Sequence, residues 1–153
     1  MNNGADLPLD SDIQPFHIPN RSFSVAQEEF IESEINERLD SNVIEECQSK
    51  PFGVSPIRPI PKKGGKQRLI INLRHLNSHC TPPKFQYEDI NKVLSLAEHD
   101  DDIVTVDLRN GFYHVDVNER LRTWLGFSFH SKFYQYKALP FGANFSPYFF
   151  CKL

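Results

Sequence analysis

The run Asp107-Leu-Arg-Asn-Gly-Phe-Tyr113 carries the residue types that metal-assisted phosphoryl transfer requires. It follows residues 103–106, whose β-branched side chains predict a buried strand. A carboxylate at a strand end is a fixed ligand for a divalent cation, because a buried ionised Asp is costly unless paired or metal-bound. Gly111 permits close backbone approach to a ligand, and Phe112 supplies an adjacent wall. The run also fits an Asp that pairs with Arg109, with Phe112 and Tyr113 as core aromatics.

A second group of candidate residues lies at the tip of a predicted hairpin. Lys63 and Arg68 flank Gly64-Gly65, which can adopt positive φ in a tight turn. Arg offers a planar fork of donors and Lys a point charge, so the pair suits the binding of a triphosphate. The spacing is not that of a P-loop, because no Ser or Thr follows Lys66. A basic turn without a ligand is the alternative.

A third motif joins a turn to the start of a helix. Leu139-Pro-Phe-Gly142 is followed by Ser146-Pro147, which predicts Ser146 as the N-cap and Pro147 as the first helical residue. A helix start can meet a phosphate backbone. The motif is equally compatible with a plain connection between a strand and a helix.

Charge is divided unevenly along the chain. The formal net charge is −3, but residues 47–87 hold eight bases and no acid, whereas residues 1–46 hold eleven acids and two bases. A stretch of 41 residues without Asp or Glu is a candidate surface for nucleic acid, because phosphate contacts dominate such affinity. A solvated basic loop that binds nothing is the alternative.

The elements that must position these residues predict an α+β fold of antiparallel hairpins and short helices. Residues 1–21 are polar, contain three Pro and predict a flexible lead-in, so the domain spans residues 22–153. Ser24 and Gln27 form a capping box before apolar residues at helical spacing. Residues 54–73 predict the basic hairpin, residues 87–97 a short helix, and residues 124–138 a second hairpin around 130–132.

Composition limits the classes to which the chain can belong. Its 153 residues suit one domain, and no stretch reaches the roughly 18–20 apolar residues of a membrane span. Cys47, Cys80 and Cys151 form neither a zinc pattern nor a disulfide framework. We therefore expect reduced thiols in an intracellular protein of the cytoplasm or nucleus, without membrane association.

Taken together, these segments resemble the reverse transcriptase domain of retroelements. The resemblance rests on four segments in the family's order and at about its spacing, over roughly residues 25–153. The amino-acid sequences of these segments are similar to those of gypsy-type or DIRS-like retrotransposons. The segments are Ser55-Pro-Ile-Arg-Pro-Ile-Pro-Lys-Lys63, Arg68-Leu-Ile-Ile-Asn-Leu-Arg-His-Leu-Asn77, Val106-Asp-Leu-Arg-Asn-Gly-Phe112 and Tyr134-Gln-Tyr-Lys-Ala-Leu-Pro-Phe-Gly142 with Ser146-Pro147.

The resemblance implies fingers and part of the palm of a polymerase that joins deoxynucleoside triphosphates to an RNA or DNA template-primer, with two Mg²⁺ ions. It also implies a role for each matching residue. The implied roles are catalytic aspartate and metal ligand for Asp107, metal ligand for the Leu108 carbonyl, and steric gate for Phe112. Lys63 (or Lys62, if the register shifts) and Arg68 would contact the triphosphate, Asn110 and Gly111 the phosphates, Phe141 the nucleotide pocket, and Gly142 to Pro147 the template.

One part of the family pattern is missing from the sequence. The family's Tyr-x-Asp-Asp hairpin, which supplies further carboxylates, has no counterpart before Leu153. We therefore expect an N-terminal fragment of a polymerase. An inactive relic or a nucleic-acid-binding module, and an unrelated phosphate-binding domain, are the alternatives.

This absence generates a prediction for the isolated chain. Two-metal phosphoryl transfer needs carboxylates from both sides of the cations, so the purified protein should not extend a primer. A primer-extension assay with Mg²⁺ and deoxynucleotides tests this expectation, and template-dependent incorporation would overturn it.

Overall fold

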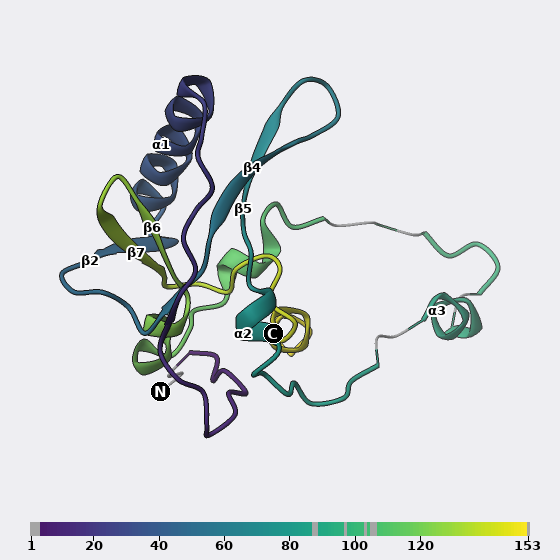
Figure 1. Ribbon diagram of the computed structural model, residues 1–153. Helices are drawn as coiled ribbons and strands as arrows, with labels where there is room; N and C mark the ends of the chain where they lie inside the picture. The colour runs from purple at the N-terminus through teal and green to yellow at the C-terminus, as the bar shows by residue number, and fades with distance from the viewer. Residues whose placement is uncertain (1–3, 87–88, 97, 103, 105–106, 153) are drawn as a thin grey trace.

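The computed structural model describes residues 4–86, 89–96, 98–102, 104 and 107–152. Its main body contains two β-sheets and a long helix that contacts both (Figure 1). The described part of the chain forms the α+β fold of hairpins and short helices that the sequence predicts. No described helix is long and apolar enough to cross a membrane.

Helix α1 (Val25–Asp40) begins at the capping box expected from the sequence. The Gln27 amide donates to the Ser24 side chain at 3.3 Å, and the Ser24 amide donates to the Gln27 side chain at 3.0 Å. The helix buries Ile31, Ile35 and Arg38, which lie on one face because they are three and four residues apart. A charged residue therefore occupies a position of the apolar stripe.

The larger sheet has the strand order β1-β3-β6-β7-β2. Strands β6 (Gly126–Phe129) and β7 (Lys132–Tyr136) form the second predicted hairpin, and β2 (Ile44–Cys47) pairs antiparallel with β7. Its turn places His130 and Ser131 at φ 47° and 62°, the left-handed pair typical of a two-residue hairpin loop. The hairpin brings Phe127 and Tyr136 into the core.

At the other edge of this sheet, neighbouring strands run parallel to one another. Strands β1 (Phe16–His17) and β3 (Gly53–Val54) pair in parallel, and Val54 pairs in parallel with Gly126. The approach is close, since a Cβ on Gly126 would lie 2.6 Å from the Pro51 Cβ. Glycine is needed at position 126 because no side chain fits there.

The segment expected to be a flexible lead-in packs against the domain. Ala5 and Leu7 belong to the core, at 6% and 7% exposure. The Ala5 amide donates to the Asp116 carbonyl at 2.7 Å, and Leu9 forms an antiparallel bridge with Cys80. This differs from the expectation because isolated apolar residues, not a periodic pattern, hold the segment.

The smaller sheet is the basic hairpin of β4 (Ile57–Pro61) and β5 (Gln67–Ile71), as predicted. Helix α2 (Arg74–Asn77) follows it, and the 3₁₀ helices η1 (Gly111–His114) and η2 (Glu119–Trp124) precede β6. Asn118 caps η2 by accepting from the Arg120 amide at 3.2 Å. The short helix α4 (Ser146–Phe150) lies near α2 (Figure 1).

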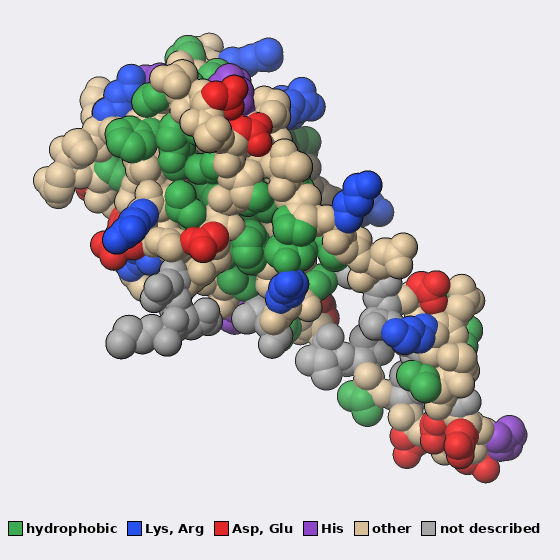
Figure 2. All heavy atoms as spheres, turned by 90° about the horizontal axis from the view of Figure 1, so that it is seen from below, with side chains coloured by type: hydrophobic (Ala, Val, Ile, Leu, Met, Phe, Trp, Pro, Cys, Tyr) green, Lys and Arg blue, Asp and Glu red, His purple; other side chains and the backbone are tan. Residues whose placement is uncertain are grey.

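Helix α3 (Ile90–Leu96) lies within the helix predicted for residues 87–97 and stands apart from the main body in Figure 1. The apolar side chains of Ile90 and Leu94 on this helix are not covered, since they are 66% and 60% exposed. Figure 2 shows that the main body also carries apolar side chains on the face seen from below. The strand predicted for residues 103–106 lies mostly outside the described residues, and Val104 within it is 82% exposed.

The three cysteines should differ sharply in reactivity. Burial raises the pKa of the Cys80 thiol to about 12 and that of Cys47 to about 11, whereas Cys151 is exposed. Because the thiolate is the nucleophile, a thiol reagent at pH 8 should label one cysteine in the native protein and three after unfolding. Mass spectrometry should locate the native label on Cys151; fast native labelling of Cys80 would contradict the structure.

Candidate functional site

A cavity of about 450 Å³ lies between helix α1, strand β5 and the segment around residues 109–113. Five cationic side chains and two carboxylates line it, so its net charge favours an anion. The charged lining residues are Lys62, Lys66, Arg38, Arg68, Arg109, Glu34 and Glu37.

The hairpin supplies most of these cations. Its turn is closed by the Lys62 amide, which donates to the Lys66 carbonyl at 2.7 Å. Gly64 and Gly65 adopt φ of 82° and 71°, with no atom within 4 Å of an added Cβ. The tip is therefore free of packing contacts, although both positions favour glycine by conformation.

The register of the hairpin decides which predicted cations reach the cavity. Arg68, which pairs with Ile60 across the hairpin, lines the cavity. Lys63 is exposed and does not line it, whereas its neighbour Lys62 does. Of the two lysines that the sequence offers, Lys62 is therefore the one that lines this cavity.

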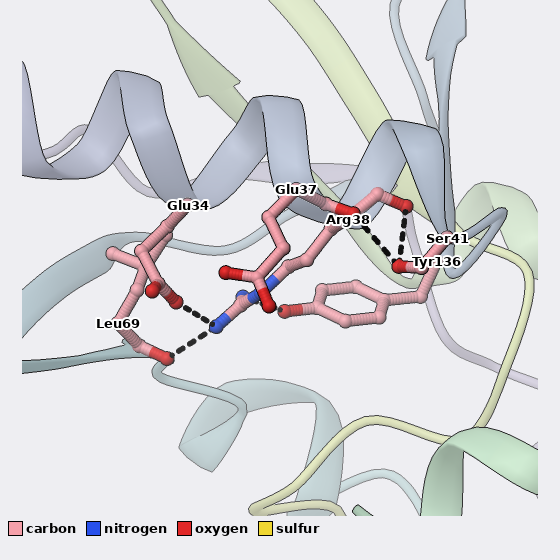
Figure 3. Close-up of polar contacts among 6 residues, drawn as sticks. All are labelled: Glu34, Glu37, Arg38, Ser41, Leu69 and Tyr136. Carbon is pink, nitrogen blue, oxygen red and sulfur yellow. Dashed lines mark hydrogen bonds and ion pairs between the residues drawn. The ribbon is translucent and has the colours of Figure 1, made fainter.

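Arg38 lines the cavity from its buried side. Figure 3 shows its guanidinium directed toward Glu34, Leu69 and Tyr136. Its guanidinium donates to the Tyr136 hydroxyl at 2.7 Å, to the Leu69 carbonyl at 3.0 Å and to the Glu34 carboxylate at 3.0 Å. These acceptors come from β7, β5 and α1. One buried side chain therefore joins the long helix to both sheets.

The surroundings of Arg38 keep it charged. Burial alone would lower the pKa of Arg38, but Tyr136, Tyr113 and Glu34 together raise it. Burial also raises the pKa of Tyr136 above its ordinary range, and Arg38 only partly opposes that rise. The pair is consequently a cation and a neutral phenol throughout the usual pH range.

Asp107 lies in a separate cavity of about 360 Å³. Asp107 is exposed, and the strand expected to precede it, at residues 103–106, lies mostly outside the described residues. Among the described residues no ion pair with Arg109 is found, and Arg109 lines the cationic cavity instead. The Asp107 cavity is lined by Asp107, Leu108, Gly111, Phe112, Phe141 and Phe150.

An aromatic cluster divides the two cavities. The Phe112 ring centroid lies 4.9 Å from that of Phe141 and 5.4 Å from that of Phe150. Phe141 also contacts Tyr113 at 5.2 Å and lines both cavities. Arg68 and Asp107 thus line adjacent cavities that share Phe141 as a common wall.

In the turn before η1, the left-handed residue is Asn110 and not the neighbouring Gly111. The positive φ lies at Asn110, at 54°, which also lines the cationic cavity. Gly111 is needed for a different reason, since an added Cβ would lie 2.8 Å from the Phe150 ring. Its close approach is therefore to an aromatic side chain of the protein.

The segment predicted to face a template is held by amide side chains. The Asn77 side chain donates to the Gly142 carbonyl at 2.8 Å and accepts from the Asn144 amide at 3.0 Å. Gly142 has φ 97°, which favours glycine. This clamp fixes the 141–145 turn against α2.

The start of α4 corrects one local prediction. Ser146 is fully buried and its hydroxyl donates to the Pro140 carbonyl at 2.9 Å, so it does not cap the helix. Phe145 occupies the N-cap position without a side-chain cap, and Pro147 lies in the first turn. The hydroxyl bonds to Pro140 because that carbonyl is buried beside it.

The Asp107 cavity makes a poor magnesium site by itself. It offers one carboxylate and the Leu108 backbone, whereas Mg²⁺ demands near-octahedral coordination by oxygen. Within the described lining, Asp107 is the only acidic residue. These residues supply part of a coordination sphere, and no reaction step can be derived from them alone.

Sequence reasoning missed Arg38, Arg109 and the clamp formed by Asn77 and Asn144. Arg38 left a signal, because it follows Ile31 and Ile35 on the apolar face of a helix. A cation in that position predicts a buried polar partner. The Asn clamp left no signal, since its two residues are 67 positions apart.

Comparison with protein families gives a match over most of the chain. The profile described as reverse transcriptase (RNA-dependent DNA polymerase) matches residues 60–153. This range includes the tip and the second strand of the basic hairpin, Asp107 and the 139–147 segment.

Curated relatives are much longer than this chain. The Retrovirus-related Pol polyprotein from transposon 297 of Drosophila melanogaster is 28% identical over 120 residues, which cover 76% of this chain and 11% of that protein. Polyprotein P3 of Commelina yellow mottle virus is 26% identical over 151 residues, which cover 93% of this chain and 8% of that protein. The Transposon Tf2-7 polyprotein of Schizosaccharomyces pombe is 22% identical over 146 residues, which cover 94% of this chain and 11% of that protein.

Solved structures share the fold. The foamy viral protease-reverse transcriptase in complex with double-stranded DNA superposes with a TM-score of 0.73 at 21% identity, over 95% of this chain and 25% of that one. The Prototype Foamy Virus Protease-Reverse Transcriptase superposes with a TM-score of 0.78 at 21% identity, over 97% of this chain and 20% of that one. At this identity the likeness establishes the fold.

Removal of the Arg38 guanidinium should destabilise the protein. In Arg38→Met the Leu69 carbonyl and the Tyr136 hydroxyl lose a buried donor, so we expect unfolding free energy to fall by about 2–4 kcal/mol. Urea denaturation followed by circular dichroism measures it. Arg120→Met, at an exposed position, is the control and should change the free energy of unfolding by less than about 0.5 kcal/mol. Equal losses of unfolding free energy in the two variants would refute the structural role of Arg38.

Proposed function

The chain belongs to the reverse transcriptase (RNA-dependent DNA polymerase) family, and from that premise we propose that it forms the fingers and first part of the palm of an RNA-directed DNA polymerase. In the whole protein, this enzyme would add deoxynucleotides to a primer. The observation that carries the proposal is the cationic cavity that shares a wall with the Asp107 cavity. Such an arrangement suits a substrate with a polyanionic tail and a reacting centre beside a carboxylate.

The cationic cavity is the proposed triphosphate site. Arg68 and Lys62, or Lys63 after movement of the unpacked tip, would neutralise the phosphates of a deoxynucleoside triphosphate. Asn110 lines the same cavity, and with Gly111 it would place backbone amides near the phosphates. Phe141 would lie beside the bound nucleotide, because it lines both cavities.

Phe112 is the proposed gate against a ribose 2′-hydroxyl. Its ring lines the Asp107 cavity and is held between Phe141 and Phe150. A side chain that is packed on two sides cannot move aside easily for an added oxygen. The packing therefore supports a steric role for Phe112.

Asp107 and the Leu108 carbonyl would supply ligands to two Mg²⁺ ions, which activate and align phosphoryl transfer when bound. The remaining ligands have to come from the substrate and from groups outside this cavity. Gly142 and Pro147 would lie near the RNA or DNA template-primer. The rigid turn held by Asn77 supports that placement.

The origin of the chain is proposed at a finer level than the family. We infer a gypsy-type or DIRS-like retrotransposon, of which this chain is the N-terminal part of the polymerase domain. The transposon polyproteins among its relatives support a retroelement, and the chain spans between 8% and 11% of the relatives described above. The three free cysteines support residence in the cytoplasm or nucleus.

A nucleic-acid-binding module without catalysis is the second candidate. It is favoured by the exposed Lys62, Lys63 and Lys66 at the hairpin tip, within the segment that lacks acids. Such binding would be electrostatic and would weaken steeply with salt. It would not depend on Mg²⁺ or on a nucleotide.

Nucleotide binding separates the two candidates. A fluorescent deoxynucleoside triphosphate should bind the purified chain, and Arg68→Gln should weaken binding about 10–100-fold, because hydrogen bonds to charged groups contribute ~1.5–3 kcal/mol. Arg120→Gln, at an exposed arginine outside the cavity, is the matched control. Fluorescence anisotropy at constant ionic strength measures both.

The same samples should be titrated with single-stranded RNA. Salt-sensitive RNA binding with no nucleotide binding would favour the second candidate and contradict the triphosphate site. Equal nucleotide affinity of Arg68→Gln and Arg120→Gln would show that binding does not use the cationic cavity.

A further inference from the structure

Asp10, Asp12 and His79 form a cluster of possible metal ligands away from both cavities. One ligand atom from each residue lies within 4.8 Å of the other two. Atoms that share one small cation lie at most about 4.4 Å apart, because metal–ligand bonds are about 2.0–2.2 Å long, so a small movement of the exposed Asp12 side chain suffices to bring the three ligand atoms onto one ion. Asp10 and His79 are half-buried and Asp12 is exposed, so the cluster opens to solvent on one side.

Backbone pairing brings the two segments together without any ion. Leu9 and Cys80 form an antiparallel bridge, and the Asp10 amide donates to the His79 carbonyl at 2.8 Å. The Thr81 amide donates to the Pro8 carbonyl at 3.0 Å. The ligand positions are therefore set by the fold, which lowers the ordering cost of binding an ion.

The mixture of ligands distinguishes this cluster from an ordinary solvated acidic surface. An imidazole nitrogen with two carboxylates suits Zn²⁺ and its first-row neighbours, whereas Mg²⁺ prefers oxygen alone. The Thr81 hydroxyl donates to the Asp10 carboxylate at 3.3 Å and can orient it, as outer hydrogen bonds do at metal sites. In the described part of the chain, neither Asp10 nor Asp12 forms an ion pair with Lys or Arg.

We propose that Asp10, Asp12 and His79 bind one divalent transition-metal ion of the zinc class, with water completing the coordination. This site is independent of Asp107 and of the proposed polymerase chemistry. The ion cross-links the N-terminal segment to the chain just after α2. Because Asn77 at the end of α2 clamps the 141–145 turn, the ion also steadies the side of the molecule that carries that turn.

The test uses tag-free protein carrying Cys151→Ser, so that neither a histidine tag nor the exposed thiol holds metal. Isothermal titration with Zn²⁺ gives stoichiometry and affinity, and Co²⁺ gives a visible spectrum that reports coordination. Asp12→Asn and His79→Gln remove ligands, while Thr81→Val removes only the supporting hydroxyl. Asp40→Asn and His114→Gln, at exposed positions outside the cluster, are the matched controls.

We expect one Zn²⁺ per chain, a weaker response to Mg²⁺, and a melting temperature that rises with zinc. Thr81→Val should weaken zinc binding about 10–100-fold, and each ligand variant should weaken it at least as much. The controls should bind as the parent does. Circular dichroism confirms that each variant is folded.

Three results would overturn the site. They are the absence of stoichiometric zinc binding, retention of full affinity in folded His79→Gln and Asp12→Asn, and equal losses in the ligand variants and the controls. Because none of these measurements involves nucleotides, failure here leaves the proposed function untouched. Conversely, failure of nucleotide binding does not affect this site.

Discussion

The buried guanidinium of Arg38 is the contact on which the arrangement of this protein most depends. Removing a cation from water is costly, and the cost is offset only when its donors find acceptors. Here the acceptors belong to α1, β5 and β7, so the helix and both sheets must reach their positions together. The cationic cavity has a defined buried side because this network is satisfied, and the basic hairpin has a fixed base below its unpacked tip.

The candidate site separates opposite charges by an aromatic wall. The hairpin supplies cations on one side, the 107–112 segment supplies a carboxylate on the other, and Phe141 belongs to both sides. A ligand that contacts Arg68 and Asp107 together has to extend past the Phe141 ring, which is 43% exposed. The packing of the phenylalanines thus sets the separation between Arg68 and Asp107, and attraction between these two charged side chains does not.

Local signals predicted local structure well. The capping box at Ser24 located the start of α1, and Gly64-Gly65 located the turn of the basic hairpin. Features that depend on distant residues were not predictable. The parallel pairing of β1 and β3 involves two residues from each strand, too few for a periodic pattern. The Asp107 cavity is lined in part by Phe150, which lies over Gly111, a contact between residues that no motif connects.

The packed N-terminal segment has a consequence for how the chain folds. Asp6 accepts a hydrogen bond from Asn118, 112 positions later, and Val54 of β3 joins β6 only at Gly126. Contacts of such long sequence separation form slowly, because a large loop must close before any of them is gained. During synthesis on the ribosome, the segment around Ala5 and Asp6 therefore has to wait for most of the chain to emerge before its partners at Val117 and Asn118 are available. Meanwhile the apolar side chains of that segment remain available to chaperones.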